Sequence, residues 1–121
     1  MGAIVSFFAK NLGKTGEDLA CDYLISKGFK ILGRNIKLKM GEIDILAEDG
    51  EDIVLVEVKT KTSNAFGEPV EEVDYFKKKK LWQLARALNQ KYSEKNIRID
   101  VISVKVGDRA EIEHIENAVE F

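Results

Sequence analysis

The chain has only one cysteine, one proline and one histidine among its 121 residues. A single cysteine, Cys21, cannot close an intramolecular disulfide or form a cysteine zinc cluster, so a reducing compartment suits it. No apolar run approaches the roughly 20 residues that a membrane-spanning helix needs, and no charged leader with an Ala-x-Ala-like cleavage site opens the chain. Because the sequence also lacks repeats and Gly/Ser linkers, it predicts one soluble, cytoplasmic domain spanning residues 1–121.

The chain also lacks a large excess of charge of either sign. Nineteen basic and twenty-one acidic side chains leave a formal net charge of −2. This balance excludes a histone-like polycation, so any contact with nucleic acid requires a local basic patch. Hydrophobic residues make up 45% of the chain, which is enough for one core that buries about two-thirds of its surface.

The apolar patterns predict a helix, three strands, a second helix and one or two further strands. The expected elements are a helix over 15–28, strands over 29–37, 42–48 and 53–59, a loop over 60–72, a helix over 74–92, a strand over 97–106 and a short edge strand over 110–115. Residues 1–12 carry apolar side chains at near-helical spacing. This N-terminal segment is expected to pack onto the chain's own core or onto a second copy in a homodimer.

The strands over 42–48 and 53–59 form a predicted hairpin, because Asp49-Gly50 lies between them. With these two residues at the centre of the turn, Asp44 is opposite Leu55 and Glu42 is opposite Glu57. Side chains alternate along each strand. The charged side chains therefore share one side of the hairpin and the apolar ones share the other: Glu42, Asp44, Glu57 and Lys59 against Ile43, Ile45, Val54, Val56 and Val58.

The charged side of this hairpin has the composition of a cation site. Asp44 and Glu57 occupy diagonal positions about 7–8 Å apart, so their carboxylates can converge on one ion. Mg²⁺ relieves the repulsion between such carboxylates, polarises a phosphodiester and acidifies an attacking water. The ammonium of Lys59 would orient that water or stabilise charge in the transition state.

An ordinary solvated strand face is the alternative interpretation, since cross-strand charge pairs there often contribute only a few tenths of a kcal/mol. The like-charge pairing of Glu42 with Glu57 favours the cation site, because a cation would relieve it.

Two segments of this hairpin resemble the signature of the PD-(D/E)XK nuclease superfamily: Gly41-Glu42-Ile43-Asp44 and Val56-Glu57-Val58-Lys59. Ile43 stands where the superfamily's name has proline. A longer combination, from about residue 13 to 106, resembles the YraN-like family of small bacterial proteins: Gly16-Glu17-Asp18-Leu19-Ala20, Gly28-Phe29, Arg34-Asn35, the two hairpin segments continued by Thr60-Lys61, Phe66-Gly67, Val73, Lys77 and Asp100-Val101. The layout is also similar to that of archaeal Holliday junction resolvases, in which a helix glutamate corresponds to Glu17.

The resemblance implies an α/β restriction-endonuclease-like core of order αβββαβ, with a mixed central sheet flanked by helices. It implies that Asp44, Glu57 and the main-chain carbonyl of Val58 bind Mg²⁺ or Mn²⁺, that Lys59 is the catalytic lysine, and that Glu17 adds a carboxylate through water. The implied activity is hydrolysis of phosphodiester bonds in DNA, including branched or single-stranded DNA in repair or recombination. The alternative is a non-catalytic nucleic-acid-binding or scaffold module that retains the nuclease fold.

Basic residues near the acidic centre predict contacts with a phosphate backbone. The set comprises Arg34, Lys37, Lys39, Lys59, Lys61 and the four consecutive lysines at 77–80. Consecutive helix residues point in all directions, so at least half of the run is expected to be solvated, and the resemblance singles out Lys77.

Other notable side chains have mostly structural interpretations. Phe66 is expected either to stack on a base or to anchor its loop. Trp82 lies beside an apolar stripe and is expected in the core or in an interface. His114 falls on the doubtful edge strand and is not expected to do acid–base chemistry. No membrane association and no small-molecule cofactor are expected.

Overall fold

The computed structural model describes residues 4–10, 13–62 and 75–119. The elements follow the order β1 (Ile4–Lys10), α1 (Gly16–Ser26), β2 (Lys30–Leu38), β3 (Gly41–Asp49), β4 (Asp52–Thr62), α2 (Tyr75–Lys91), β5 (Asn96–Val106) and β6 (Arg109–Ile115). The strands form one sheet in the order β1-β6-β5-β4-β3-β2. Only β4 and β5 run parallel among these neighbours, so the sheet is mixed.

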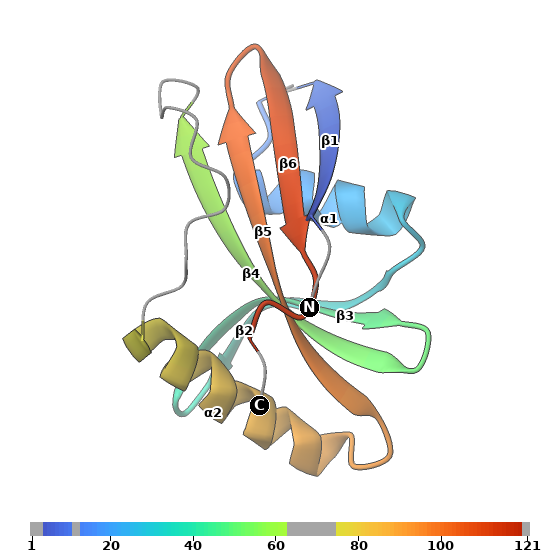
Figure 1. Ribbon diagram of the computed structural model, residues 1–121, viewed down its shortest axis with the longest axis vertical. Coiled ribbons are helices and arrows are strands. Elements are labelled where there is room, and N and C mark those ends of the chain that lie inside the picture. The colour runs from blue at the N-terminus through green and yellow to red at the C-terminus, as the bar shows by residue number, and fades with distance from the viewer. Residues whose placement is uncertain (1–3, 11–12, 63–74, 120–121) are drawn as a thin grey trace.

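The two helices cover different parts of the twisted sheet (Figure 1). One core cluster lies under α1 and a second lies under α2. This mixed α/β arrangement is that of a restriction-endonuclease-like core, and it confirms the predicted fold class. Neither helix in the described part of the chain is long and apolar enough to cross a membrane.

Helix α1 begins with a capping box, in which the hydroxyl of Thr15 accepts from the amide of Asp18 and the Asp18 carboxylate accepts from the amide of Thr15. Its predicted apolar face is confirmed, since Leu19, Ala20, Tyr23 and Leu24 are all buried. A Cβ on Gly16 would lie 2.0 Å from the hydroxyl of Thr60. Glycine is therefore required for the first turn of α1 to lie against β4.

Helix α2 packs its predicted stripe against the sheet, with Leu81, Leu84 and Leu88 buried among strand residues. Trp82, which was expected in the core or in an interface, is 37% exposed, so it is not in the core, and the interface stays a prediction. It lies one position along the helix from Leu81 and therefore about 100° around the axis, away from the buried stripe.

The N-terminal segment is a strand rather than the helix that its apolar spacing suggested. Strand β1 pairs antiparallel with β6 from Ile4↔Ile115 to Lys10↔Arg109. The ring of Phe7 packs edge-on against Tyr23 at 5.4 Å, so the segment packs onto the chain's own core. Its β-branched and aromatic residues suit a pleated surface, and β6 supplies the strand edge that periodicity could not reveal. Consequently β6 is an inner strand, and β1 and β2 are the edges.

Strand β4 is longer than predicted. It continues to Thr62 because parallel pairing with β5 continues to Thr62↔Val106, so residues 60–62 are not part of a loop. The remainder of the predicted loop, including Phe66, lies outside the described residues.

The hairpin between β3 and β4 forms in a register two residues away from the predicted one. Asp49 pairs with Asp52 and Leu46 with Leu55, so Gly50 and Glu51 are the central residues of the turn. Gly50 has a φ of 60°, and Glu51 does not take a positive φ. This combination is that of a type II′ turn, which has glycine at the first of its two central positions. Asp49 thereby avoids the positive φ that the predicted turn would require.

This register places two aspartates opposite each other, and Arg98 on β5 neutralises them. Its guanidinium lies 3.1 Å from the Asp49 carboxylate and 3.0 Å from that of Asp52. The remaining nitrogens donate to both oxygens of Asp100 at 2.9 and 3.0 Å. Like charges directly opposite in a hairpin are destabilising, so this cation removes the cost of the observed register.

The network continues through His114, which is buried on β6 rather than exposed at an edge. Its Nε2 lies 2.7 Å from Asp100 and its Nδ1 lies 2.9 Å from the Tyr23 hydroxyl. A carboxylate only accepts hydrogen bonds, so Nε2 carries a proton and donates. Burial raises the pKa of Tyr23 to about 12, which leaves its hydroxyl protonated and able to donate to Nδ1. The network thus joins α1, β5 and β6 to the turn between β3 and β4.

Removing Asp100 should be strongly destabilising. Burial works to raise its pKa, but hydrogen bonds from His114 and Arg98 outweigh burial and hold the pKa below its usual value. We predict that Asp100→Ala lowers the free energy of unfolding by about 3–5 kcal/mol, because Arg98 and His114 lose their buried partner. Urea denaturation measures this loss. The exposed ion pair of Asp22 with Lys14 provides the control, and Asp22→Ala should cost less than about 1 kcal/mol. Equal losses in the two variants would contradict a buried network.

Candidate active site

The site begins at Asp44, where the side chains of β3 stop alternating regularly between the two faces of the sheet. Ile43 packs in the core under α2, whereas Ile45 packs in the core under α1. The expectation that these two isoleucines share a face is therefore wrong. On the adjoining strand β2, Asn35 has a φ of 51° at the same level. Because both strands rotate here, the Asp44 carboxylate turns toward β4 and accepts a hydrogen bond from the Val58 amide at 2.8 Å.

The observed register brings Asp44 close to Glu57. The paired residues begin at Ile45↔Val56, and one step further along both strands places Asp44 level with Glu57. Burial and the nearby charge of Asp44 raise the pKa of Glu57 to about 7, although the ammonium of Lys77 acts in the opposite direction. Glu42 is not opposite Glu57, because this register puts Glu42 two residues beyond the level of Glu57. Asp44, rather than Glu42, is therefore the carboxylate that repels Glu57.

Two lysines on different elements lie on the same side as Glu57. Lys77 of α2 places its Nζ 3.2 Å from the Glu57 carboxylate. It was predicted to contact phosphate, and the structure places its ammonium at the acidic centre. Lys59 is half-buried on β4 two residues after Glu57, and by alternation it projects from the same face. Lys61 follows at the end of that face, in a small cavity lined also by Ser103, Lys105 and Glu111.

The remaining two predicted site residues lie together on the α1 side. Arg34 donates to Glu17 at 3.0 Å and to Asp18 at 2.7 Å, and Asn35 donates to Glu17 at 2.9 Å. The charge of Arg34 is therefore balanced by two acids. Glu17 is thus bonded to Asn35, which lies level with Asp44 on the neighbouring strand. Gly16, next to Glu17, lies against Thr60, the residue after Lys59.

The donor set fits a hard divalent cation of the Mg²⁺ type. Within the described ranges, no group of three or more His, Cys, Asp or Glu side chains could hold a metal, so the site offers the two carboxylates of Asp44 and Glu57. Mg²⁺ commonly binds one or two carboxylates and fills its other positions with water and substrate phosphates. The N–H and C=O of one strand residue point toward the same neighbouring strand. Because the Val58 amide bonds Asp44 of β3, the Val58 carbonyl also faces β3. The mutual repulsion of the carboxylates is what a bound cation would relieve.

Sequence reasoning missed the buried network that stabilises this site. The sequence places His114 on an edge strand, includes Asp100 only in the family resemblance, and gives no role to Arg98. A signal was present, because opposite charges two residues apart in an otherwise apolar strand share one face. The partners on β6 and α1 could not be inferred from local pattern.

The mixed sheet covered by two helices, with paired carboxylates at the point where β3 and β4 diverge, defines the class as a restriction-endonuclease-like α/β domain. Residues 16–104 match the model of a family described as "Uncharacterised protein family UPF0102", and the chain belongs to that family. The predicted resemblance to the YraN-like family, which is the same family, is confirmed.

Relatives from several bacteria match over nearly their whole length. A UPF0102 protein of Thermodesulfovibrio yellowstonii is 48% identical over 108 residues, covering 88% of this chain and 94% of the relative. A UPF0102 protein of Geobacter metallireducens is 44% identical over 120 residues, covering 97% and 98%. One from Clostridioides difficile is 44% identical over 111 residues, covering 90% and 96%.

The raised pKa of Glu57 predicts a pH-dependent effect on stability. Because the folded-state pKa lies above the ordinary value of 4.5, the protonated form favours folding, and this contribution is lost as the pH rises through about 7. We predict that Glu57→Gln raises the free energy of unfolding by roughly 1–3 kcal/mol at pH 8 in the presence of a chelator, and has little effect at pH 5.

Urea denaturation at the two pH values measures this difference. The exposed Glu42 provides the control, and Glu42→Gln should leave stability within about 0.5 kcal/mol at both. A Glu57→Gln variant that is no more stable than wild type at pH 8 would contradict the repulsive carboxylate pair.

Proposed function

We propose that this protein is a metal-dependent nuclease that hydrolyses phosphodiester bonds in DNA. The observation that supports this proposal is the position of Glu57 level with Asp44, where burial and the charge of Asp44 together raise the pKa of Glu57 to about 7. A protein that only needed a stable sheet would gain by removing this repulsion. Retaining two such carboxylates beside lysine is characteristic of a site that binds a divalent cation and a phosphate together.

Each side chain has a distinct role in the proposed reaction. Asp44 and Glu57 hold Mg²⁺ or Mn²⁺ with the carbonyl of Val58, and the amide of Val58 keeps the Asp44 carboxylate oriented toward β4. When bound, the ion supplies polarisation of the phosphodiester and a more acidic water. The ammonium of Lys59 stabilises the negative charge that develops on the phosphate. Glu17 contributes a carboxylate through water from the α1 side.

Lys77 has two successive roles in this proposal. Before an ion binds, its ammonium partly neutralises Glu57, from which it is separated by 3.2 Å. After an ion binds, the ammonium is available to a phosphate of the DNA backbone, with Lys61 at the other end of the same face. Arg34, balanced by Glu17 and Asp18, contributes less to backbone binding than the lysines do.

Cleavage of DNA provides the direct test. Wild type, Asp44→Ala, Lys59→Ala and the exposed control Glu42→Gln are compared on single-stranded, duplex and branched DNA with Mg²⁺ or Mn²⁺. We expect Asp44→Ala and Lys59→Ala to reduce the rate by about 100-fold or more, and Glu42→Gln to retain it. Equal activity in all four proteins would assign the cleavage to a contaminant or to another site.

Metal binding is tested separately by calorimetry with Mn²⁺. We expect wild type to release heat on saturable binding, and Glu57→Gln to weaken the affinity about 10-fold or more because the ion loses one of two carboxylates. Lys30→Gln, at an exposed position at the start of β2, should bind as wild type does. Equal affinity in wild type and Glu57→Gln would place the ion elsewhere.

A non-catalytic nucleic-acid-binding module is the second candidate. It is favoured by helix α2, which carries six basic residues and no acidic one although the whole chain has a net charge of −2. DNA binding that survives Asp44→Ala, with no cleavage in any metal, would support this candidate. The expected homodimer remains a prediction, and sedimentation of the full chain would test it.

A further inference from the structure

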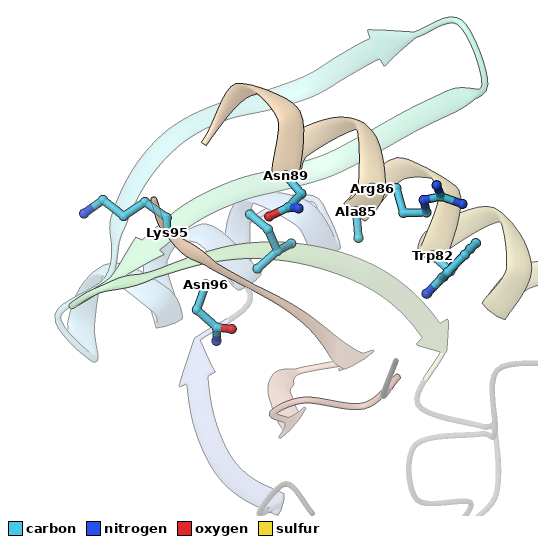
Figure 2. A pocket seen from close by; sticks show the side chains of 7 residues that line it. Trp82, Ala85, Arg86, Asn89, Lys95 and Asn96 are labelled. Carbon is cyan, nitrogen blue, oxygen red and sulfur yellow. The ribbon is translucent and has the colours of Figure 1, made fainter. Parts of the chain in front are cut away.

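Helix α2 presents a groove beside its buried stripe, where it meets the start of β5. The groove has a volume of about 330 Å³ and is lined by Trp82, Arg86 and Asn89 from α2 and by Lys95, Asn96 and Ile97 from β5 and the residue before it. Figure 2 shows these side chains and their origin on the two elements. A groove of this size holds one small planar group rather than a folded partner.

The polar chemistry of the groove suits an anion that carries a hydrogen-bonding ring. All six charged residues of α2 are basic. On the β5 side, Lys95 pairs with Glu48 at 3.6 Å and Asn96 donates to Asp52 at 3.2 Å, so the basic charge at the groove comes from α2. The amide of Asn89 can both donate and accept hydrogen bonds, as base edges require.

The aromatic chemistry favours a nucleobase as that ring. Trp82 is 37% exposed, and the guanidinium carbon of Arg86 lies 4.8 Å from the centre of its ring. Bases stack on aromatic rings and on arginine planes, with little dependence on sequence. Lys78 lies one turn before Trp82 on the same side of the helix, where it can contact the adjoining phosphate.

The groove and the candidate active site both include side chains of helix α2. Lys77, whose ammonium contacts Glu57, precedes Trp82 by five residues, or about 7.5 Å along the helix axis. Five residues also correspond to about 140° around the axis, so a strand would cross α2 obliquely to pass from the carboxylates to the groove. A base inside a duplex is already stacked and paired, so only an unpaired base can enter without an unstacking cost of a few kcal/mol.

We propose that the groove between α2 and the start of β5 is a base-stacking subsite, in which Trp82 and Arg86 hold one unpaired nucleotide of a DNA strand. This inference rests on the proposed function for the identity of the polymer, and it specifies that function further by naming DNA with unpaired bases as the ligand. Trp82 is then a residue that determines specificity rather than part of the core.

Trp82 is the sole tryptophan of the chain, so its fluorescence reports directly on the groove. The full-length protein is titrated with a short oligothymidylate in the presence of a chelator, which prevents cleavage. We expect saturable quenching by the single strand, and weaker quenching by a duplex of the same length. Polyphosphate and polyglutamate, anions without bases, should quench little. Quenching by either of these as strong as by oligothymidylate would overturn the proposal in favour of a general anion or an acidic peptide.

Variants separate stacking from charge in a parallel assay with a labelled oligothymidylate. Trp82→Ala should weaken binding by at least about five-fold, while Trp82→Phe should retain most of the affinity. Phe8 provides the matched control, because it is 59% exposed and also lies beside an arginine, Arg109, at 6.0 Å on the far edge of the sheet. Equal affinity in Trp82→Ala and Phe8→Ala would overturn the subsite.

This result can be distinguished from failure of the proposed nuclease activity. Quenching and Trp82-dependent binding without cleavage in any metal would support the subsite and reject the nuclease. Cleavage that depends on Asp44 but is unchanged, together with binding, in Trp82→Ala would reject the subsite and support the nuclease.

Discussion

The guanidinium of Arg98 is the interaction on which the arrangement of this protein depends. It bonds Asp49 and Asp52 across the turn between β3 and β4 and also bonds both oxygens of Asp100 within β5. Without a cation at this position, the observed hairpin register would place two aspartates opposite each other at a net cost. With it, the register is favourable, and β4 is joined to its antiparallel and its parallel neighbour at the same point.

The consequence appears at the other end of the hairpin. The register that Arg98 stabilises brings Asp44 level with Glu57, and the break in alternation at Asp44 turns its carboxylate toward the Val58 amide. Two carboxylates then face each other with one lysine, Lys77, in contact. The stable network around Arg98 at one end of the hairpin thus supports an electrostatically unfavourable pair of carboxylates at the other end. Such pairs of opposed environments are found where proteins bind ions and substrates.

Helix α2 combines two functions by using different sides. The leucine stripe beginning at Leu81 buries one side against the sheet and fixes the orientation of the helix. That orientation directs Lys77 toward Glu57 and leaves Trp82 and Arg86 beside the start of β5. Because Lys77 and Trp82 belong to one helix, helix geometry fixes their spacing along its axis. A single element can therefore position both contacts that we propose, one with a phosphate and one with a base.

Local periodicity was enough to predict the αβββαβ order and the buried face of α1, and short motifs predicted Asp44, Glu57 and Lys59 as the chemical centre. The assembled sheet alone establishes that residues 4–10 form a strand, since the edge of β6 that pairs with them lies about a hundred residues away in the chain. It also decided the hairpin register, through Arg98 of β5, and the burial of His114 between Tyr23 and Asp100. Charge neutralisation and strand pairing between distant segments leave no periodic signal, so these features became visible only once the sheet was assembled.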